Sequence, residues 1–371
     1  MAKIDALLLE MISRKGSDLH LEQKRKPKIR INGRLTELLQ WPVLEEQALA
    51  EMMQEILSKN AWSSFKNTGD SDLAYAVEDG TRFRCNYFRH FYGYGAVFRM
   101  IPSKLMTLDE LGVPEIVKKF VDYQSGLVLI TGPTGSGKSS TMAAIIDDIN
   151  TKYKRKIVTI EEPVEFLHKN KKSVIVHREV GEDTKSFSQG LRTALKSDVN
   201  IILVGEMRDK ETIELALTAA EMGILIFGTL HTNSAPKTIS RIIDVFPQKQ
   251  KNQIREILAN TLKAVISQQL VRSADEKRRW VACEILTRTS ALASIIRRGE
   301  TDRLDSEIQM NRASGMITMD SCLLQLAESG KITDDEAYIK AINKAAFRKS
   351  AEDTWEILDV SKPEEEIEQN L

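Results

Sequence analysis

The sequence lacks a long apolar run, and that absence excludes a membrane-spanning helix. Its longest apolar runs, such as Gly126–Ile130 and Ile224–Phe227, are far shorter than the about 20 apolar residues that a helix needs to cross a bilayer. The chain opens Met-Ala-Lys-Ile-Asp, where charges break up any apolar stretch, so we expect no secretory signal. The sequence therefore predicts a protein that is soluble and stays inside the cell.

The sequence also has few cysteines and no surplus of charge. Cys85, Cys283 and Cys322 show no C-x-x-C spacing and no framework of pairs. We expect buried thiols in a reducing compartment, which excludes a zinc site or disulfides. Lysine plus arginine (53) balances aspartate plus glutamate (53). A protein that tracks nucleic acid gains affinity by neutralising phosphates, so we expect no nucleic-acid partner.

The first hundred residues have the pattern of an α+β domain. A helix is expected over Ile4–Ser13, and alternating residues on both sides of Asn32-Gly33 predict a hairpin. A helix over Glu45–Ser58 follows from its apolar spacing. Further strands are expected at Leu73–Val77, Arg82–Phe88 and Ala96–Ile101. Prolines at 102 and 114 mark a linker, so we assign residues 1–102 to a first domain and residues 103–117 to the linker.

From residue 118 onward, apolar strands alternate with helices, which predicts a parallel sheet with crossover helices. We assign residues 118–272 to this domain, residues 273–348 to a helical part and residues 349–371 to a flexible acidic tail. The expected strands are Leu127–Thr131, Ile157–Ile160, Ile201–Val204 and Ile224–Thr229, and the expected helices are Ser139–Asn150, Phe187–Leu195 and Lys210–Met222.

A glycine-rich phosphate loop lies between the first of these strands and its helix. The segment reads Gly132-Pro133-Thr134-Gly135-Ser136-Gly137-Lys138-Ser139, followed by Ser140, and it matches G-x-x-x-x-G-K-[ST] in full. Its glycines let successive N–H groups point at phosphates, and the helix dipole adds positive charge. We expect Lys138 to reach the β and γ phosphates of ATP and Ser139 to bind Mg²⁺. A chance glycine-rich turn is the alternative.

Three carboxylates follow the next strand, in Thr159-Ile-Glu161-Glu162-Pro-Val-Glu165. Open α/β sheets bind ligands at the carboxyl ends of their strands, and ATP hydrolysis needs a carboxylate that orients or deprotonates water. One of these residues could serve, although a solvated acidic turn would have the same composition.

Two later strands also end in polar residues. Asn200-Ile-Ile-Leu-Val-Gly205-Glu206 has the hydrophobic strand of a Walker B motif with glycine in place of the first acid. Glu206 is therefore the candidate for the Mg²⁺ shell, unless it is a surface residue. His231 ends the strand in Leu225-Ile-Phe-Gly-Thr-Leu-His231. It could report the state of the γ phosphate to the next subunit, or it could be purely structural.

Read together, these segments resemble the secretion-and-pilus ATPases, and within them the retraction ATPases of type IV pili. The resemblance covers nearly the whole chain. Its most specific stretches are IILVGEMRD (201–209), LALTAAE (215–221), FGTLHT (227–232) and RIIDVFP (241–247), with SDLH (17–20), RINGR (30–34), RFRCN (82–86) and AVFRMIP (96–102) in the first domain.

The resemblance implies a PAS-like first domain and a RecA-like ATPase domain with C-terminal helices, assembled as a hexameric ring. ATP would lie between the two domains, and Arg82, Arg84 and Arg99 would close on its phosphates, since guanidinium stays charged and offers two donors. Glu165 matches the family's catalytic glutamate, with Glu161 in reserve. The implied partners are further copies of this chain, an inner-membrane platform protein and a paralogous pilus ATPase, at the inner face of the cytoplasmic membrane.

Three departures from the family bear on its function. Glu162 stands where the family has aspartate, Ile224 replaces one of two histidines, and Ala291–Arg298 retains little of a C-terminal motif that serves retraction. An accessory retraction paralogue, a type II secretion or pilus assembly ATPase, and a RecA-fold nucleic-acid motor therefore remain alternatives. Assembly and secretion ATPases typically have a longer N-terminal region and many have a four-cysteine zinc site, neither of which is seen here. A structural ring whose ATP sites mainly hold it together is a further alternative.

Overall fold

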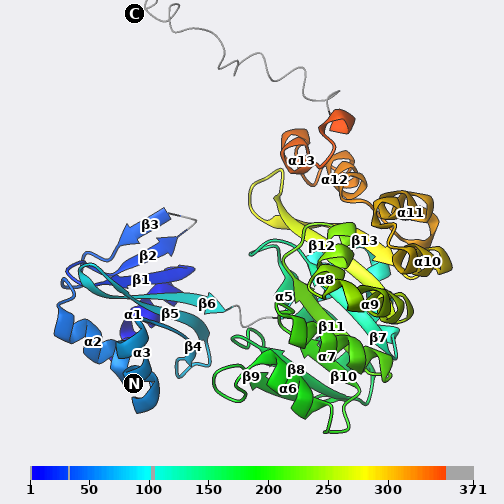
Figure 1. Cartoon of the computed structure of the whole chain (residues 1–371). Helices are drawn as coiled ribbons and strands as arrows, with labels where there is room; N and C mark the ends of the chain where they lie inside the picture. Colours follow the sequence, from blue (N-terminus) through cyan, green and yellow to red (C-terminus); the bar gives the residue numbers. More distant parts are fainter. Residues whose placement is uncertain (1, 32–33, 102–104, 348–371) are drawn as a thin grey trace, which may run out of the picture. The chain divides into compact units, whose positions relative to one another are not determined.

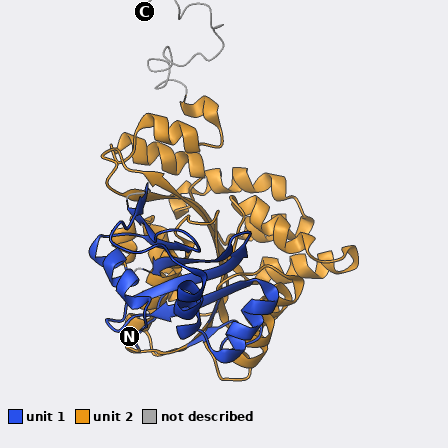
Figure 2. Cartoon of the chain, turned by 90° about the vertical axis from the view of Figure 1, so that its left-hand side faces the viewer, with its two compact units in different colours: residues 1–105, 160–169, 177–185 blue, residues 106–159, 170–176, 186–371 orange. Residues whose placement is uncertain are grey.

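The computed structural model describes residues 2–31, 34–101 and 105–347, and these form mixed α/β structure built on two sheets (Figure 1). They group into two compact units (Figure 2). The first unit comprises residues 1–105, 160–169 and 177–185, and the second comprises the remaining residues from 106 onward. The chain thus passes between the units several times, and the acidic segment that contains Glu161 and Glu165 belongs to the first.

The first unit is an antiparallel sheet that buries one face under helices. Its strands lie in the order β3-β2-β1-β6-β5-β4. Leu19, Cys85 and Phe98 are fully buried in one core with Leu8 and Phe65 from the helices. Successive residues of a strand alternate between faces, so the opposite face receives the polar residues. The elements are α1 (Asp5–Ser13), β1 (Asp18–Glu22), β2 (Lys28–Ile31), β3 (Arg34–Glu37), α2 (Glu46–Glu55), α3 (Lys59–Thr68), β4 (Asp70–Ala76), β5 (Arg82–His90) and β6 (Gly93–Ile101).

The second unit contains a seven-stranded sheet in the order β13-β12-β7-β11-β10-β8-β9. Its central strands β7 and β11 run parallel and are buried along their whole length, as expected for strands covered on both faces. The elements up to the last strand are α4 (Leu108–Leu111), η1 (Glu115–Asp122), β7 (Gly126–Thr131), α5 (Lys138–Lys152), β8 (Lys156–Glu161), β9 (Val174–Glu179), α6 (Phe187–Ala194), β10 (Ile201–Val204), α7 (Lys210–Glu221), β11 (Leu225–Leu230), α8 (Ala235–Asp244), α9 (Gln248–Thr261), β12 (Leu262–Arg272) and β13 (Arg279–Thr287).

Short helices complete the second unit beyond β13. A backbone bridge joins Ile285 of β13 to Ile317, with N–H···O distances of 2.8 and 3.2 Å. Met319, Leu323 and Ala337, from two of these helices, share a core with Val271 and Ala282 of the sheet, so those two helices are continuous with it. The elements are α10 (Ser290–Arg298), η2 (Thr301–Arg303), α11 (Leu304–Met310), η3 (Arg312–Ser314), α12 (Met319–Glu328), α13 (Asp334–Lys340) and η4 (Lys344–Phe347).

Two expectations about the chain's organisation require correction. The region after residue 270 is not wholly helical, because β13 (Arg279–Thr287) pairs antiparallel with β12. A nearly continuous apolar run does not by its periodicity distinguish a buried strand from a buried helix. The expected linker also carries structure, since Leu108 and Val117 lie in the core of the second unit. The expected turn at Asn32-Gly33 and the acidic tail lie outside the described residues.

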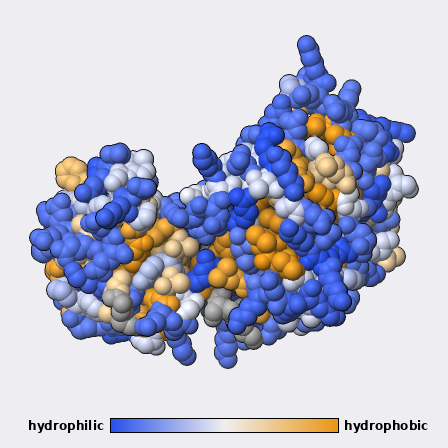
Figure 3. Space-filling view, turned by 90° about the horizontal axis from the view of Figure 1, so that it is seen from below, coloured by the Kyte–Doolittle hydropathy of each residue, from blue (hydrophilic) through white to orange (hydrophobic). Residues whose placement is uncertain are grey.

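On the face shown in Figure 3, apolar residues gather in patches among predominantly polar ones. Within residues 2–31, 34–101 and 105–347, no helix combines the length and the apolar character needed to cross a bilayer.

Candidate active site

The phosphate loop connects β7 to α5 and depends on two of its glycines. Gly132 has φ +142°, and a Cβ there would lie 2.2 Å from the carbonyl oxygen of Gln268 on β12. Gly137 has φ +85° and forms the N-cap of α5. Side chains rarely adopt such backbone conformations, so the loop curls close to β12 only with glycine. The helix then begins at Lys138, with its N-terminal N–H groups facing the loop.

Lys138 folds back over this loop. Its Nζ donates to the carbonyl oxygens of Gly132 at 2.8 Å and Pro133 at 3.0 Å, and the residue is 9% exposed. A buried ammonium needs acceptors on several sides. Phosphate oxygens arriving at the loop would offer charged acceptors to the same protons, which makes stronger hydrogen bonds. The ammonium of Lys138 therefore lies against the loop, and its contact with the phosphates of ATP stays a prediction.

The remaining residues of the loop divide into exposed and buried positions. Pro133, Thr134 and Gly135 are exposed, while Ser139 and Ser140 are half-buried on the first turn of α5. Ser136 is 3% exposed, and its Oγ is buried without a hydrogen-bond partner. Most buried polar atoms are paired, so an unpaired hydroxyl in a phosphate loop fits a site that accepts a polar ligand.

Glu206 and His231 are brought together at the ends of neighbouring strands. β10 and β11 run parallel with Val204 opposite Gly228, so the residues that follow them meet at one edge of the sheet. Nε2 of His231 lies 3.1 Å from Oε1 of Glu206. Arg208 contacts the same carboxylate. Burial alone would raise the pKa of Glu206, but Arg208 and His231 together lower it below its ordinary value, so the carboxylate is ionised at neutral pH.

The acidic segment after β8 is held within the first unit by two side chains from different strands. Nη1 of Arg82 donates to the carbonyl oxygen of Val164 at 2.8 Å, and the N–H of Val164 donates to Oε2 of Glu179 at 3.0 Å. Burial raises the pKa of Glu179, which Arg82, 3.9 Å away, partly offsets. Glu165, one residue further on, is half-buried. Arg82 thus fixes the backbone beside the candidate catalytic glutamate.

The other two arginines share a face of the same sheet. Arg84 on β5 lies directly opposite Arg99 on β6, and Arg99 lies opposite Asp18 on β1. Nε of Arg99 is 2.7 Å from Oδ1 of Asp18. Burial would raise the pKa of Asp18, but Ser17 and Arg99 lower it overall. Two cations placed opposite each other repel, so this polar face favours an anionic ligand.

Sequence reasoning missed several residues that support these positions. Nε2 of Gln268 donates to the carbonyl oxygen of Ser136 at 2.8 Å. Glu179 orients the segment after β8, and Asp18 orients Arg99. Gln268 and Glu179 lie outside the stretches that carry the resemblance, and Asp18 lies within SDLH (17–20), where sequence reasoning gave it no role. Only alternation along β1 and β9 could have placed Asp18 and Glu179 on particular faces.

The fit of a magnesium ion depends on oxygen ligands. Mg²⁺ is usually held by one or two protein oxygens, with phosphates and waters completing its shell. Among the described residues, no three histidine, cysteine or acidic side chains cluster as a metal cage. The hydroxyl of Ser139 and the ionised carboxylate of Glu206 are ligands of the chemical type that Mg²⁺ prefers, so the donor set fits.

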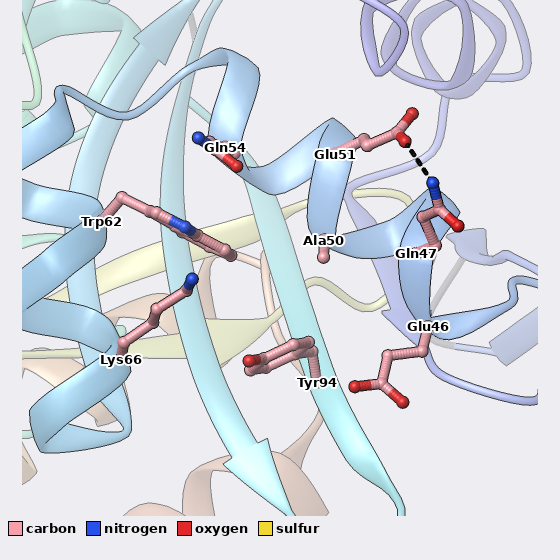
Figure 4. Close-up of a pocket in the computed structure, with 8 residues that line it drawn as sticks. All are labelled: Glu46, Gln47, Ala50, Glu51, Gln54, Trp62, Lys66 and Tyr94. Carbon is pink, nitrogen blue, oxygen red and sulfur yellow. Dashed lines mark hydrogen bonds between the residues drawn. The ribbon is translucent and has the colours of Figure 1, made fainter.

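A separate hollow of about 460 Å³ lies on the first unit beside α2 and α3 (Figure 4). The aromatic rings of Trp62 and Tyr94 lie 6.1 Å apart there, and Glu51 accepts a hydrogen bond from Gln47. None of the candidate residues lines it. We therefore distinguish this hollow from the candidate active site.

Comparison with known proteins finds relatives that match most of the chain. Residues 1–359 match the family described as type II/IV secretion system protein. The chain is 45% identical to the type IV pilus retraction ATPase PilT of Pseudomonas aeruginosa over 90% of this chain and 97% of that protein. It is 34% identical to the type IV pilus ATPase PilU of the same organism, over 91% and 88% of the two chains.

A solved structure is similar over nearly the whole chain. The crystal structure of the pilus retraction motor PilT with bound ADP superposes with a TM-score of 0.87 at 38% identity, covering 94% of this chain and 100% of that one. The chain belongs to the type II/IV secretion system protein family.

Proposed function

We propose that this chain is the ATP-hydrolysing motor that retracts type IV pili and so drives twitching motility. The observation that carries the proposal is the phosphate loop with Lys138 folded over it, together with the Glu206–His231 pair at neighbouring strand ends. The family match and the similarity to PilT support both the ATPase activity and its use in retraction.

The second unit supplies the groups that bind ATP. N–H groups of the loop and of the first turn of α5 bind the phosphates, and Lys138 exchanges carbonyl partners for phosphate oxygens. Ser139 and Glu206 would hold Mg²⁺, which when bound neutralises charge on the transferred phosphoryl group. His231 restrains the Glu206 carboxylate through their hydrogen bond.

The first unit supplies the acidic segment and the arginines. Glu165 orients or deprotonates the attacking water, and Glu161 is the reserve candidate for this role. The backbone of Val164, held by Arg82 and Glu179, limits the positions that Glu165 can take. We further propose that Arg84 and Arg99 reach phosphate oxygens when nucleotide is bound, since their shared face concentrates positive charge.

The larger assembly remains part of the proposal. The first unit corresponds to a PAS-like domain and the second to a RecA-like domain with its C-terminal helices, and six copies form a ring. The ring works at the inner face of the cytoplasmic membrane on a platform protein of the pilus. ATP binding and release would open and close each subunit, because a ligand shifts a conformational equilibrium only by its differential affinity for the two states.

A genetic experiment tests the proposal directly. Surface pili are counted in a strain that lacks this chain and is complemented with wild type or with Lys138→Ala. Excess pili that wild type cures and Lys138→Ala does not cure are expected for a retraction motor. Loss of pili in the deletion strain would instead indicate an assembly ATPase. The alternative of a nucleic-acid motor is tested by measuring ATP turnover of the two purified proteins with and without nucleic acid. Stimulation of turnover by nucleic acid would support that alternative.

An accessory retraction ATPase is the second candidate, and the helix α10 favours it. This helix retains little of the family motif associated with retraction. The similarity to PilU is compatible with such a role, although the identity to PilT is higher. For an accessory role, we expect the number of surface pili to be unchanged in the deletion strain. Overproducing a paralogue should then lower this number only when this chain is also present.

A further inference from the structure

A chain of buried hydroxyl groups connects the phosphate-loop strand to the segment that carries His231. Oγ1 of Thr131, the residue before Gly132, lies 2.8 Å from Oγ of Ser267 and 3.4 Å from Oγ1 of Thr238 on α8. Oγ1 of Thr238 lies 2.7 Å from that of Thr232, the neighbour of His231. Thr131, Ser267 and Thr238 are all 0% exposed, so no water competes for the contacts among these three, whereas Thr232 is half-buried.

The shortest bond that Thr238 donates goes to the backbone of its own helix start. Its hydroxyl donates to the carbonyl oxygen of Ser234 at 2.7 Å. A hydroxyl has one proton to donate and two lone pairs. With this proton on Ser234, Thr232 donates to Thr238, and the 2.7 Å contact restrains the side chain of Thr232 directly beside His231. The shortest of these contacts lie on the His231 side, so Thr238 acts mainly on that segment.

Glu284 holds the same turn from the opposite side. Its Oε1 accepts the N–H of Ala235, the first residue of α8, at 2.7 Å, and the residue is 3% exposed. The backbone of Met319 on α12 also donates to this carboxyl group. One buried side chain on β13 thus bonds to the start of α8 and to the start of a C-terminal helix.

We propose that Thr238 and Glu284 are positioning residues that hold the segment 231–235 so that His231 stays on Glu206, and that Glu284 ties the C-terminal helices to this segment. The inference rests on the proposed ATPase function and adds two residues to it. Neither side chain touches nucleotide. Both act by restricting the backbone between the end of β11 and the start of α8.

Turnover and nucleotide binding by the full chain test the proposal first. Thr238→Val removes the hydroxyl at nearly constant volume, and Glu284→Ala removes the acceptor for Ala235. We expect each to lower kcat at least about tenfold, within the roughly 10²-fold that a misplacement of about 1 Å costs, while the affinity for an ATP analogue changes little. Thr238→Ser and Glu284→Gln keep the contacting atoms and should restore most of the turnover. Thr218→Val on the exposed face of α7 is the matched control.

A double-mutant cycle with His231→Ala separates positioning from general destabilisation. If Thr238 acts through His231, Thr238→Val causes no further loss in the His231→Ala background, because residues that act as a unit are not additive. An equal loss in both backgrounds, or a His231→Ala protein with wild-type turnover, would overturn the inference. A wild-type protein without turnover would instead overturn the proposed function.

A second readout does not depend on activity. The rate at which diethyl pyrocarbonate modifies His231 is measured by mass spectrometry in the same variants. Nε2 of His231 is held by Glu206 although its side chain is 42% exposed. We expect faster modification in Thr238→Val and Glu284→Ala than in wild type, Thr238→Ser and Thr218→Val. Equal rates in all five proteins would contradict the positioning role even if the variants lost stability.

Discussion

Nε2 of His231 lies 3.1 Å from Oε1 of Glu206, although 24 residues separate them in sequence. The contact follows from two parallel strands in register, each ending just before its polar residue. Because Arg208 also contacts this carboxylate, Glu206 stays ionised. It does so at the edge of the sheet where the phosphate loop also begins. The pair therefore links β10, which ends before the expected Mg²⁺ ligand Glu206, to β11, which ends before His231, the residue expected to report the nucleotide state.

Removing the charge of Glu206 tests that link. Glu206→Gln is expected to lower kcat roughly 10- to 100-fold, the range found when groups around a metal site are altered, since an amide neither binds Mg²⁺ strongly nor pairs with Arg208. Steady-state ATP hydrolysis at saturating ATP is the measurement. Glu214→Gln on the exposed face of α7 is the control and should match wild type. Wild-type turnover in Glu206→Gln would remove this residue from the site.

Substitution of the first loop glycine should destabilise the second unit. Gly132→Ala places a methyl group 2.2 Å from the carbonyl oxygen of Gln268, at φ +142°. We expect the free energy of unfolding to fall by about 3 kcal/mol or more, since strained backbone alone costs about 1–3 kcal/mol. Urea unfolding measures it.

Gly135→Ala is the matched control for that substitution. Gly135 has φ +79°, but a Cβ added there would have no atom within 4 Å. It therefore carries the conformational cost without the steric clash, and we expect a loss of only about 1 kcal/mol. Equal losses at the two glycines would show that close approach to β12 is not what requires Gly132.

The pH dependence of stability should reveal Glu284. Burial raises the pKa of Glu284 to about 7, and the nearby Asp305 and Asp320 add to the effect, while the N–H groups of Ala235 and Met319 oppose it. The folded protein therefore binds a proton that the unfolded chain releases near its ordinary pKa of about 4.3. By linkage, this stabilisation is fully present below that pKa and is lost as pH rises through about 7.

Glu284→Gln cannot be ionised, so it should become more stable relative to wild type as pH increases from 5 to 8. The expected change is on the order of 1–3 kcal/mol, measured by urea unfolding at each pH. Glu328→Gln, at an exposed position of α12, provides the comparison and should follow wild type at every pH. A difference between wild type and Glu284→Gln that is independent of pH would mean that Glu284 is ionised throughout.

The sequence predicted the parts of the fold whose signals are local. The phosphate loop, the helix after it and the strand Ile201–Val204 carry their own motif or apolar run, and they form as expected. β1 (Asp18–Glu22) and α3 (Lys59–Thr68) were missed because their apolar residues are few and are completed by contacts from other elements. β13 was misread because a buried apolar run suits either kind of structure.

In the candidate site, too, residues within short motifs could be predicted from the sequence, whereas contacts between distant segments could not. Lys138 and Glu206 follow from short motifs, but the contacts of Glu206 with His231 and of Arg82 with Val164 depend on strand register. Glu284 and Thr238 had no motif at all. Their importance appears only when the burial and hydrogen bonds of residues about 50 to 100 positions apart are known.

Arg82 and Arg84 lie two residues apart on β5, yet their environments predict different effects. Nη1 of Arg82 donates to the carbonyl oxygen of Val164, whereas Arg84 is exposed opposite Arg99. We expect Arg82→Ala to accelerate amide hydrogen exchange across residues 160–169, because it removes a hydrogen bond to this segment and a cation beside the partly buried Glu179. It should also lower kcat, since Glu165 lies in the loosened segment.

Arg84→Ala serves as the matched control for local order. It should leave exchange of residues 160–169 at the wild-type rate even if it weakens ATP turnover, since it would act on phosphate rather than on the backbone. Equal acceleration in the two variants would contradict the distinction drawn between them. If Arg82→Ala instead left exchange unchanged and raised the KM for ATP, Arg82 would act on nucleotide and not on the segment that carries Glu165.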